Sequence, residues 1–120
     1  MSQAFKRAER VAELVHAELS RLLREEVRDP RLQLASITTV RLTDDLRVAR
    51  VYFVPLGGQG DAQAILAGLE RGKGFFRSRI AKRLQLRYTP DLRFFADDHL
   101  EQAVAMTSLL RGLVPSEDEE

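Results

Sequence analysis

The first quarter of the chain carries a helical pattern of apolar positions. Apolar residues recur there at intervals of three and four, at Val11, Leu14, Val15, Leu19, Leu22 and Leu23. This spacing predicts an amphipathic helix over about residues 5–27, with Glu18 at the edge of its apolar side. Asp29-Pro30 should end the helix, because the residue before a proline is pushed out of the helical backbone region.

Two runs rich in β-branched and aromatic residues follow, over residues 37–42 and 48–54. The turn Thr43-Asp44-Asp45 separates them, which predicts a β-hairpin. Apolar and polar positions alternate in the second run, so one face of that strand should pack against a core containing Ala49, Val51 and Phe53.

A second helical pattern begins after the glycine-rich loop at residues 55–60. Asp61 is a suitable N-cap, and the apolar spacing continues to Leu84. The sequence Gly72-Lys73-Gly74 interrupts it, which predicts a kink or a break between two helical segments.

The last predicted elements are a short strand over residues 92–96 and a helix capped by Asp98 and Glu101. The order is then helix, strand, strand, kinked helix, strand, helix. A three-stranded sheet must cover one face with these helices, which indicates an α+β fold. Residues 1–113 should form this single domain, and residues 114–120 a short, disordered acidic tail.

Composition narrows the class of protein. The chain has 120 residues, enough for one domain, and 44% hydrophobic with 31% charged residues is typical of a globular protein. No apolar run approaches the ~20 residues that span a bilayer, and the charged N-terminus lacks the apolar region of a signal peptide. Cysteine is absent. We therefore expect a cytoplasmic protein. The sequence has no unpaired apolar stripe, which favours a monomer.

Charge is unevenly distributed although the net charge is only +1. Basic residues dominate the segment 70–93, where no acid occurs between Glu70 and Asp91. A solvated helix face normally interleaves acids with its bases, so this pattern favours contact with a nucleic acid. Phe75 could stack on a base there, but a phenylalanine at helical spacing is more typical of a core.

Catalytic and metal-binding patterns are weak. His16 has no nucleophile motif around it, and the cluster Asp97-Asp98-His99-x-Glu101 is better explained as a helix start than as a metal site. Gly57-Gly58-Gln59-Gly60 has the form of the GxxG clamp of K-homology domains, but it lies between a strand and a helix and is better explained as a flexible connection. We expect no enzyme activity, no metal and no cofactor.

Several short motifs together resemble the ribosome-binding factor A family. They run in order over residues 7–110 and cover most of the chain. The motifs are Arg7-x-x-Arg10-Val11-Ala12, Asp29-Pro30-Arg31-Leu32, Asp45-Leu46, Ala49-x-Val51-Tyr52, Gly74-Phe75-x-Arg77 and Leu84-x-Leu86-Arg87-x-x-Pro90-x-Leu92-x-Phe94.

The resemblance implies a type II K-homology (KH)-like fold, in which a helix–kink–helix with Ala-x-Gly replaces the GxxG clamp. This chain has Gly72-Lys73-Gly74 at that position, with glycine where the family has alanine. The resemblance also implies binding to the free 30S small ribosomal subunit and its 16S rRNA. Help with late 30S maturation and 16S rRNA 5′-end processing, a role in cold adaptation and no enzymatic activity are implied as well.

We expect the RNA-binding surface to lie on the kinked helix, with Lys73, Arg77 and Arg87 projecting to solvent. Its residues are predicted to be Arg71, Gly72, Lys73, Gly74, Arg77, Arg79, Lys82, Arg83 and Arg87. The alternatives are a protein–protein adaptor that uses the first helix and the acidic tail, a small DNA-binding regulator, and a generic basic RNA-binding module.

Overall fold

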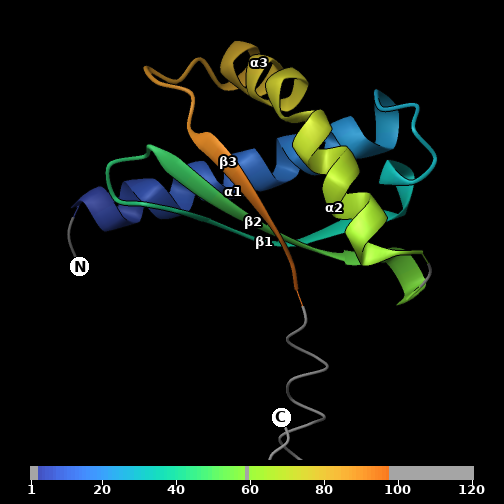
Figure 1. Ribbon diagram of the computed structural model, residues 1–120. Helices are drawn as coiled ribbons and strands as arrows, with labels where there is room; N and C mark the ends of the chain where they lie inside the picture. The colour runs from blue at the N-terminus through green and yellow to red at the C-terminus, as the bar shows by residue number, and fades with distance from the viewer. Residues whose placement is uncertain (1–2, 59, 98–120) are drawn as a thin grey trace, which may run out of the picture.

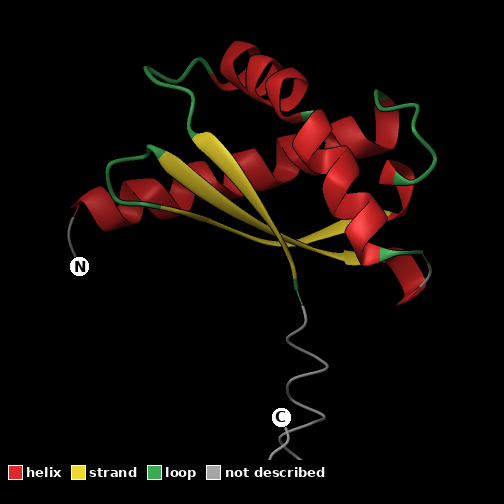
Figure 2. Ribbon diagram, viewed as in Figure 1, coloured by secondary structure: helices red, strands yellow, loops and turns green. Residues whose placement is uncertain are grey.

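The computed structural model describes residues 3–58 and 60–97. Three α-helices and a three-stranded sheet make up this part of the chain (Figures 1 and 2). Their order is α1 (Gln3–Glu25), β1 (Ala35–Leu42), β2 (Val48–Pro55), α2 (Ala62–Arg71), α3 (Lys73–Leu84) and β3 (Asp91–Ala96). The expected last helix and the acidic segment 114–120 lie outside the described residues.

Helix α1 matches the predicted amphipathic helix, with one correction on its apolar side. Its buried positions include Val15, Leu19 and Leu22, as expected. Leu14, in contrast, is 46% exposed, while Glu18 is only 5% exposed. Glu18 lies on the side of α1 that faces α3. Its carboxylate pairs there with Arg21 of α1 and Arg83 of α3, and these partners compensate for its burial.

The predicted hairpin is present, and the third strand completes the sheet in the order β1-β2-β3. Strands β1 and β2 are antiparallel, and β2 and β3 are parallel. A bulge in β1 between Ile37 and Thr39 leaves Thr38 outside the ladder, where its hydroxyl donates to the Asp97 carboxylate at 2.7 Å. The last described residue is therefore tied to the opposite edge of the sheet.

The second helical pattern forms two helices, as the sequence predicted. Asp61 caps α2 by accepting from the Gln63 amide at 2.9 Å. Helix α2 ends at Arg71 and α3 begins at Lys73, so Gly72 is the single residue between them. Gln85 ends α3 in the left-handed conformation, with φ of 53°.

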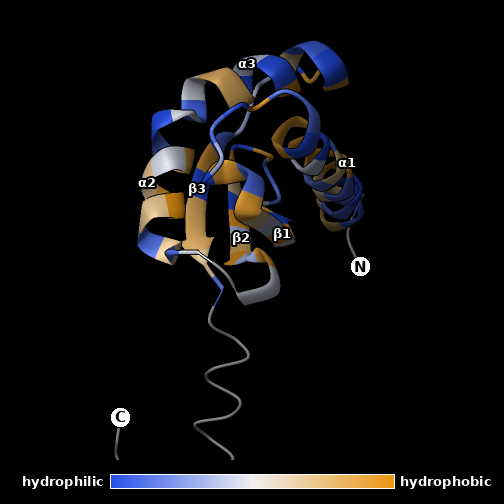
Figure 3. Cartoon of the chain, turned by 90° about the vertical axis from the view of Figure 1, so that its right-hand side faces the viewer, coloured by the Kyte–Doolittle hydropathy of each residue, from blue (hydrophilic) through white to orange (hydrophobic). Residues whose placement is uncertain are grey.

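The core lies between the helices and one face of the sheet. Ala49, Val51 and Phe53 of β2 are all fully buried, which confirms the predicted alternation. They pack in one cluster with residues from all three helices and from β3. In the view of Figure 3, α2 lies to the left of the strands, α1 to the right and α3 above them. Within the described residues, no helix is both long and apolar enough to cross a membrane.

Candidate nucleic-acid interface

The break between α2 and α3 follows from the backbone at Gly72. Its φ of −87° and ψ of 3° depart from helical values but are open to residues other than glycine. The Gly72 amide still donates to the Gly68 carbonyl, and its own carbonyl accepts from the Phe76 amide. A Cβ at Gly72 would stand 3.0 Å from the buried Phe76 ring, so in this chain the ring occupies space that an alanine methyl would need.

The first turn of α3 faces solvent without a side-chain cap. Phe76 is the first α3 residue whose amide bonds back to a carbonyl, that of Gly72. The amides before it have no partner in the helix, as in the first turn of any helix, and carry partial positive charge. Gly74 is exposed, and no heavy atom lies within 4 Å of the position its Cβ would take. This turn can therefore be approached closely by a phosphate.

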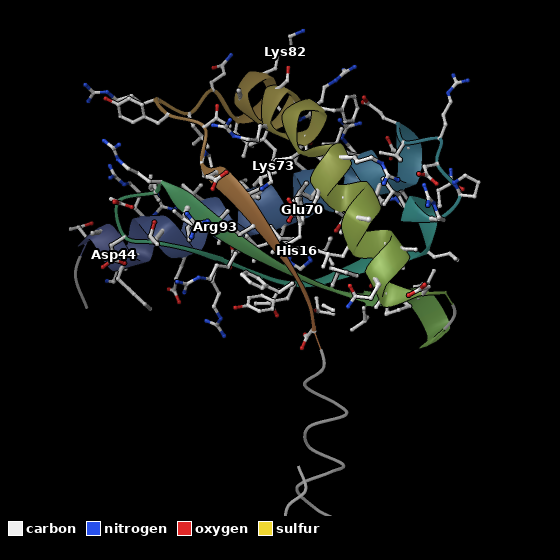
Figure 4. The ribbon with its side chains drawn as sticks, viewed as in Figure 1. His16, Asp44, Glu70, Lys73, Lys82 and Arg93 are labelled. Atoms are coloured by element: carbon white, nitrogen blue, oxygen red, sulfur yellow. The ribbon has the colours of Figure 1, made fainter. Side chains whose placement is uncertain are left out.

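Three predicted basic residues are exposed and form no ion pair within the described residues. They are Arg71 at the end of α2, Lys82 on α3, and Arg87 in the following loop. Lys82 points away from the body of the protein (Figure 4). The Arg87 guanidinium lies 5.4 Å from the centre of the exposed Tyr88 ring. Among the predicted RNA-binding residues, these are the cations most available to an anionic partner.

Three other predicted residues have acidic partners. Lys73 pairs with Glu70 at 3.1 Å, Arg79 with Glu26 at 3.4 Å and Arg83 with Glu18 at 3.8 Å. Glu18 and Glu26 belong to the α1 region, more than fifty residues away in sequence, which is why local charge patterning did not reveal them. The basic segment is therefore partly neutralised, although Arg79 and Arg83 remain 46% and 66% exposed.

Arg77 does not project to solvent, so this prediction is wrong. Its Nε donates to the Pro90 carbonyl and its Nη2 to the Thr89 carbonyl, each at 3.0 Å. The guanidinium satisfies two carbonyls of the loop that enters β3, so it is held by the fold. Arg77 is thus partly buried and bonded to this loop, and its contact with RNA stays a prediction.

Phe75 is another correction, because the sequence favoured a core position. The ring is 37% exposed and packs edge-on against the buried Phe76, with centroids 5.6 Å apart. The Arg79 guanidinium lies 5.0 Å from its centre. Next to a helix break, Phe75 thus offers a partly exposed ring with an adjacent cation, which suits stacking on a base.

The buried carboxylate of Glu18 organises the charges between α1 and α3. Its oxygens accept from Arg21 Nη2 at 2.8 Å and from Nε at 3.2 Å. These hydrogen bonds, with smaller contributions from the charges of Arg21 and Arg83, hold the pKa of Glu18 below its ordinary value despite desolvation. Because Arg21 also contacts Glu25 and Glu26, one arginine joins three acids of α1 and its C-terminal end.

The remaining candidates fit structural roles. His16 Nε2 lies 3.0 Å from the Ile37 carbonyl oxygen on the edge of β1. Gly57, Gly58 and Gly60 all have positive φ, as suits a tight connection after β2. Within the described residues no group of three metal-ligating side chains is found, and most of the 97–101 cluster lies beyond them.

The sequence is similar to known proteins over nearly its whole length. The family model described as ribosome-binding factor A matches residues 7–110. Ribosome-binding factor A from Thiobacillus denitrificans is 41% identical over 114 residues, covering 95% of this chain and 92% of the relative. That from Nitrosococcus oceani is 41% identical over 117 residues, covering 98% and 92%.

Solved structures agree with these matches. The crystal structure of ribosome-binding factor A from Thermus thermophilus has a TM-score of 0.67 at 25% identity, covering 74% of this chain and 94% of that one. A homology model of the T. thermophilus factor, fitted into the cryo-EM map of a 30S complex, has a TM-score of 0.55 at 31% identity, covering 71% and 93%. The fold is thus KH-like, with the helix break at the expected position. Together the matches show that this chain belongs to the ribosome-binding factor A family.

Proposed function

We propose that this protein binds the 30S ribosomal subunit through the surface around the α2–α3 break and assists late maturation of the subunit. The observation that carries the proposal is family membership over residues 7–110. The cryo-EM map of a 30S complex with ribosome-binding factor A, into which the homology model of the T. thermophilus factor was fitted, supports the choice of partner. The proposed partner RNA is 16S rRNA, and 5′-end processing and growth in the cold are the processes it would affect.

The geometry suits contact with an RNA backbone. Arg71, Lys82 and Arg87 supply charges that no ion pair within the described residues neutralises. The exposed Gly74 lets a phosphate approach the free amides of α3. Phe75 offers a ring beside this anion-binding turn. We infer that the protein acts by holding an immature rRNA conformation, without bond-making chemistry of its own and without a metal or cofactor.

A pair of substitutions tests the location of the surface. Replacing Arg71 and Lys82 by Gln removes two charges that make no internal ion pair among the described residues, so the fold should be unaffected. If each charge neutralises one phosphate, affinity for the purified 30S subunit at 0.1 M salt should fall on the order of 30-fold. The matched control replaces Lys6 and Arg10, two exposed bases of α1, by Gln.

The outcomes separate the possibilities. Equal losses in the two double variants would indicate a general charge effect and a generic basic RNA-binding module. No loss in the Arg71→Gln/Lys82→Gln variant would contradict the proposed surface. Arg77 is unsuitable for this test, because its removal would leave two loop carbonyls without their donor.

A further inference from the structure

One face of the sheet is not covered by any described helix. Alternate residues of β2 and β3 point into the core, and the residues between them point to the other side, here called the open face. The strand register places Arg41 of β1 opposite Arg50 of β2, and Arg50 opposite Arg93 of β3 (Arg93 is labelled in Figure 4). The three exposed arginines therefore form one row across adjacent strands that lie about 4.8 Å apart.

Aromatic side chains form the next row on the same face. Thr39, Tyr52 and Phe95 lie opposite one another in the register. The rings of Tyr52 and Phe95 stack, with centroids 5.3 Å apart and planes at 27°. Phe95 is 40% exposed although it lies on a strand. The open face thus joins a row of cations to a pair of partly exposed rings.

Only one arginine of this row forms an ion pair among the described residues. Asp91 pairs with Arg93 at 3.2 Å. Arg41 and Arg50 have no acidic oxygen within ion-pair distance among the described residues. Both arginines border a groove between α1 and β1. Glu9, Glu13 and Asp44 also line this groove, but none of them forms an ion pair with either arginine.

The arrangement is unfavourable for the isolated protein. Like charges directly opposite each other on neighbouring strands destabilise a sheet. A bound polyanion would remove this repulsion, and exposed rings on a sheet are a common platform for the bases of a single strand. The bases of a duplex are stacked within the helix, so the rings favour a single-stranded ligand.

We propose that the open face binds a single-stranded RNA segment, with the arginine row on its phosphates and the Tyr52–Phe95 pair under its bases. This surface lies on the side of the sheet opposite to the helices. It is therefore distinct from the surface of Arg71 and Lys82, and the inference goes beyond the proposed function. A protein with both surfaces could hold two parts of an rRNA at once.

The test measures binding of a labelled ten-nucleotide oligouridylate to the full-length protein by fluorescence anisotropy. In the Arg41→Gln/Arg50→Gln variant, loss of two phosphate contacts should weaken binding on the order of 30-fold at 0.1 M salt and lower the log–log salt slope by about 1.4–1.8. The Tyr52→Leu/Phe95→Leu variant should bind at least about 5-fold more weakly, from the loss of base stacking.

Two variants serve as controls. The Lys6→Gln/Arg10→Gln variant loses the same charge from the exposed side of α1 and should bind nearly as the wild type does. The Arg71→Gln/Lys82→Gln variant should retain most oligouridylate binding. Thermal unfolding provides a check on folding, because the Arg41→Gln/Arg50→Gln variant should be at least as stable as the wild type once the repulsion is removed.

Several results would overturn the inference. Wild-type affinity in the Arg41→Gln/Arg50→Gln variant would do so, as would a loss no larger than that of the α1 control. If oligouridylate binding depends on Arg71 and Lys82 alone, the strand binds the helical surface and the proposed function survives without this inference. The converse result is weakened oligouridylate binding by the Arg41→Gln/Arg50→Gln variant together with unchanged 30S binding by the Arg71→Gln/Lys82→Gln variant. It would support the open face as an RNA site and refute the proposed surface around the α2–α3 break.

The acidic segment at the end of the chain is the alternative ligand of the open face. NMR resonances of Tyr52 and Phe95 should shift on addition of oligouridylate. They should not shift when Glu117, Glu119 and Glu120 are replaced by Gln and Asp118 by Asn. The reverse pattern would assign the open face to the chain's own acidic tail and overturn the proposal.

Discussion

At the scale of single residues, the glycine at position 68 has a structural task that the sequence does not reveal. In the sequence it is a weak point, because a glycine within a helix costs about 1 kcal/mol relative to alanine. In the structure, a Cβ at this position would stand 2.8 Å from Cδ2 of Leu32, which is itself buried. Gly68 therefore allows α2 to approach the turn after α1 closely.

The Gly68→Ala substitution should destabilise the protein although it improves helix propensity. The added methyl must displace Leu32 in a packed region, so we expect a loss of about 1–3 kcal/mol in the free energy of unfolding. Urea denaturation measures it. A variant as stable as the wild type would show that Leu32 moves aside without cost.

The ion pair at Glu18 makes stability depend on pH. Because the folded protein holds the pKa of Glu18 below its unfolded value, this contribution is complete above the unfolded pKa and is lost as pH falls through the folded pKa. The Glu18→Gln variant should lose about 1–2 kcal/mol of unfolding free energy at neutral pH, through the hydrogen bonds from Arg21. The difference from the wild type should shrink at acidic pH, as the Glu18 carboxyl becomes protonated in the folded protein.

Urea denaturation at both pH values checks this prediction. Glu25→Gln is the matched control, since Glu25 contacts the same arginine but is 54% exposed. Its effect on stability should be small at both pH values. A Glu18→Gln deficit that stays constant down to acidic pH would show that packing, not charge, accounts for the loss.

At the scale of elements, the helices and strands were largely predictable and their mutual contacts were not. The hairpin, the Asp61 cap and the break at residue 72 follow from local rules of spacing and capping, and all three are observed. Arg77, Arg79 and Arg83 were all predicted to belong to one RNA-binding surface. Their roles diverge because their partners are loop carbonyls and acids of the α1 region, which no local pattern places beside them.

Gly74, in the first turn of α3, should affect stability and 30S binding in opposite directions when it is replaced by alanine. The site of a Cβ is empty and φ is not positive, so Gly74→Ala should stabilise the protein by about 0.4–1 kcal/mol. If RNA approaches this turn closely, the same methyl should weaken 30S binding. Ser78→Ala, at another exposed position of α3, should leave binding unchanged.

Thermal unfolding and 30S binding, measured on both variants, decide this point. Reduced 30S binding confined to Gly74→Ala, together with increased stability of that variant, would support close approach of the RNA. Increased stability with unaltered binding would show that the glycine is not needed by the partner, and that only the basic side chains contribute at the break.

At the scale of the whole molecule, the two faces of the sheet divide the protein into unlike surfaces. The helical side carries the break at Gly72 and a basic segment partly neutralised by acids of the α1 region. The open face carries the arginine row and the Tyr52–Phe95 pair. The sequence contained the alternation that exposes these side chains, but the alignment of the arginines depends on strand register and on the parallel pairing of β3.

Binding to the small subunit is tested most directly by co-sedimentation of the protein with purified small and large ribosomal subunits over a series of salt concentrations. We expect pelleting with the small subunit alone, with affinity falling as salt rises at a log–log slope of roughly −3.5 to −6, for about five to seven phosphate contacts. Equal pelleting with both subunits, or binding to the small subunit that does not respond to salt, would contradict it.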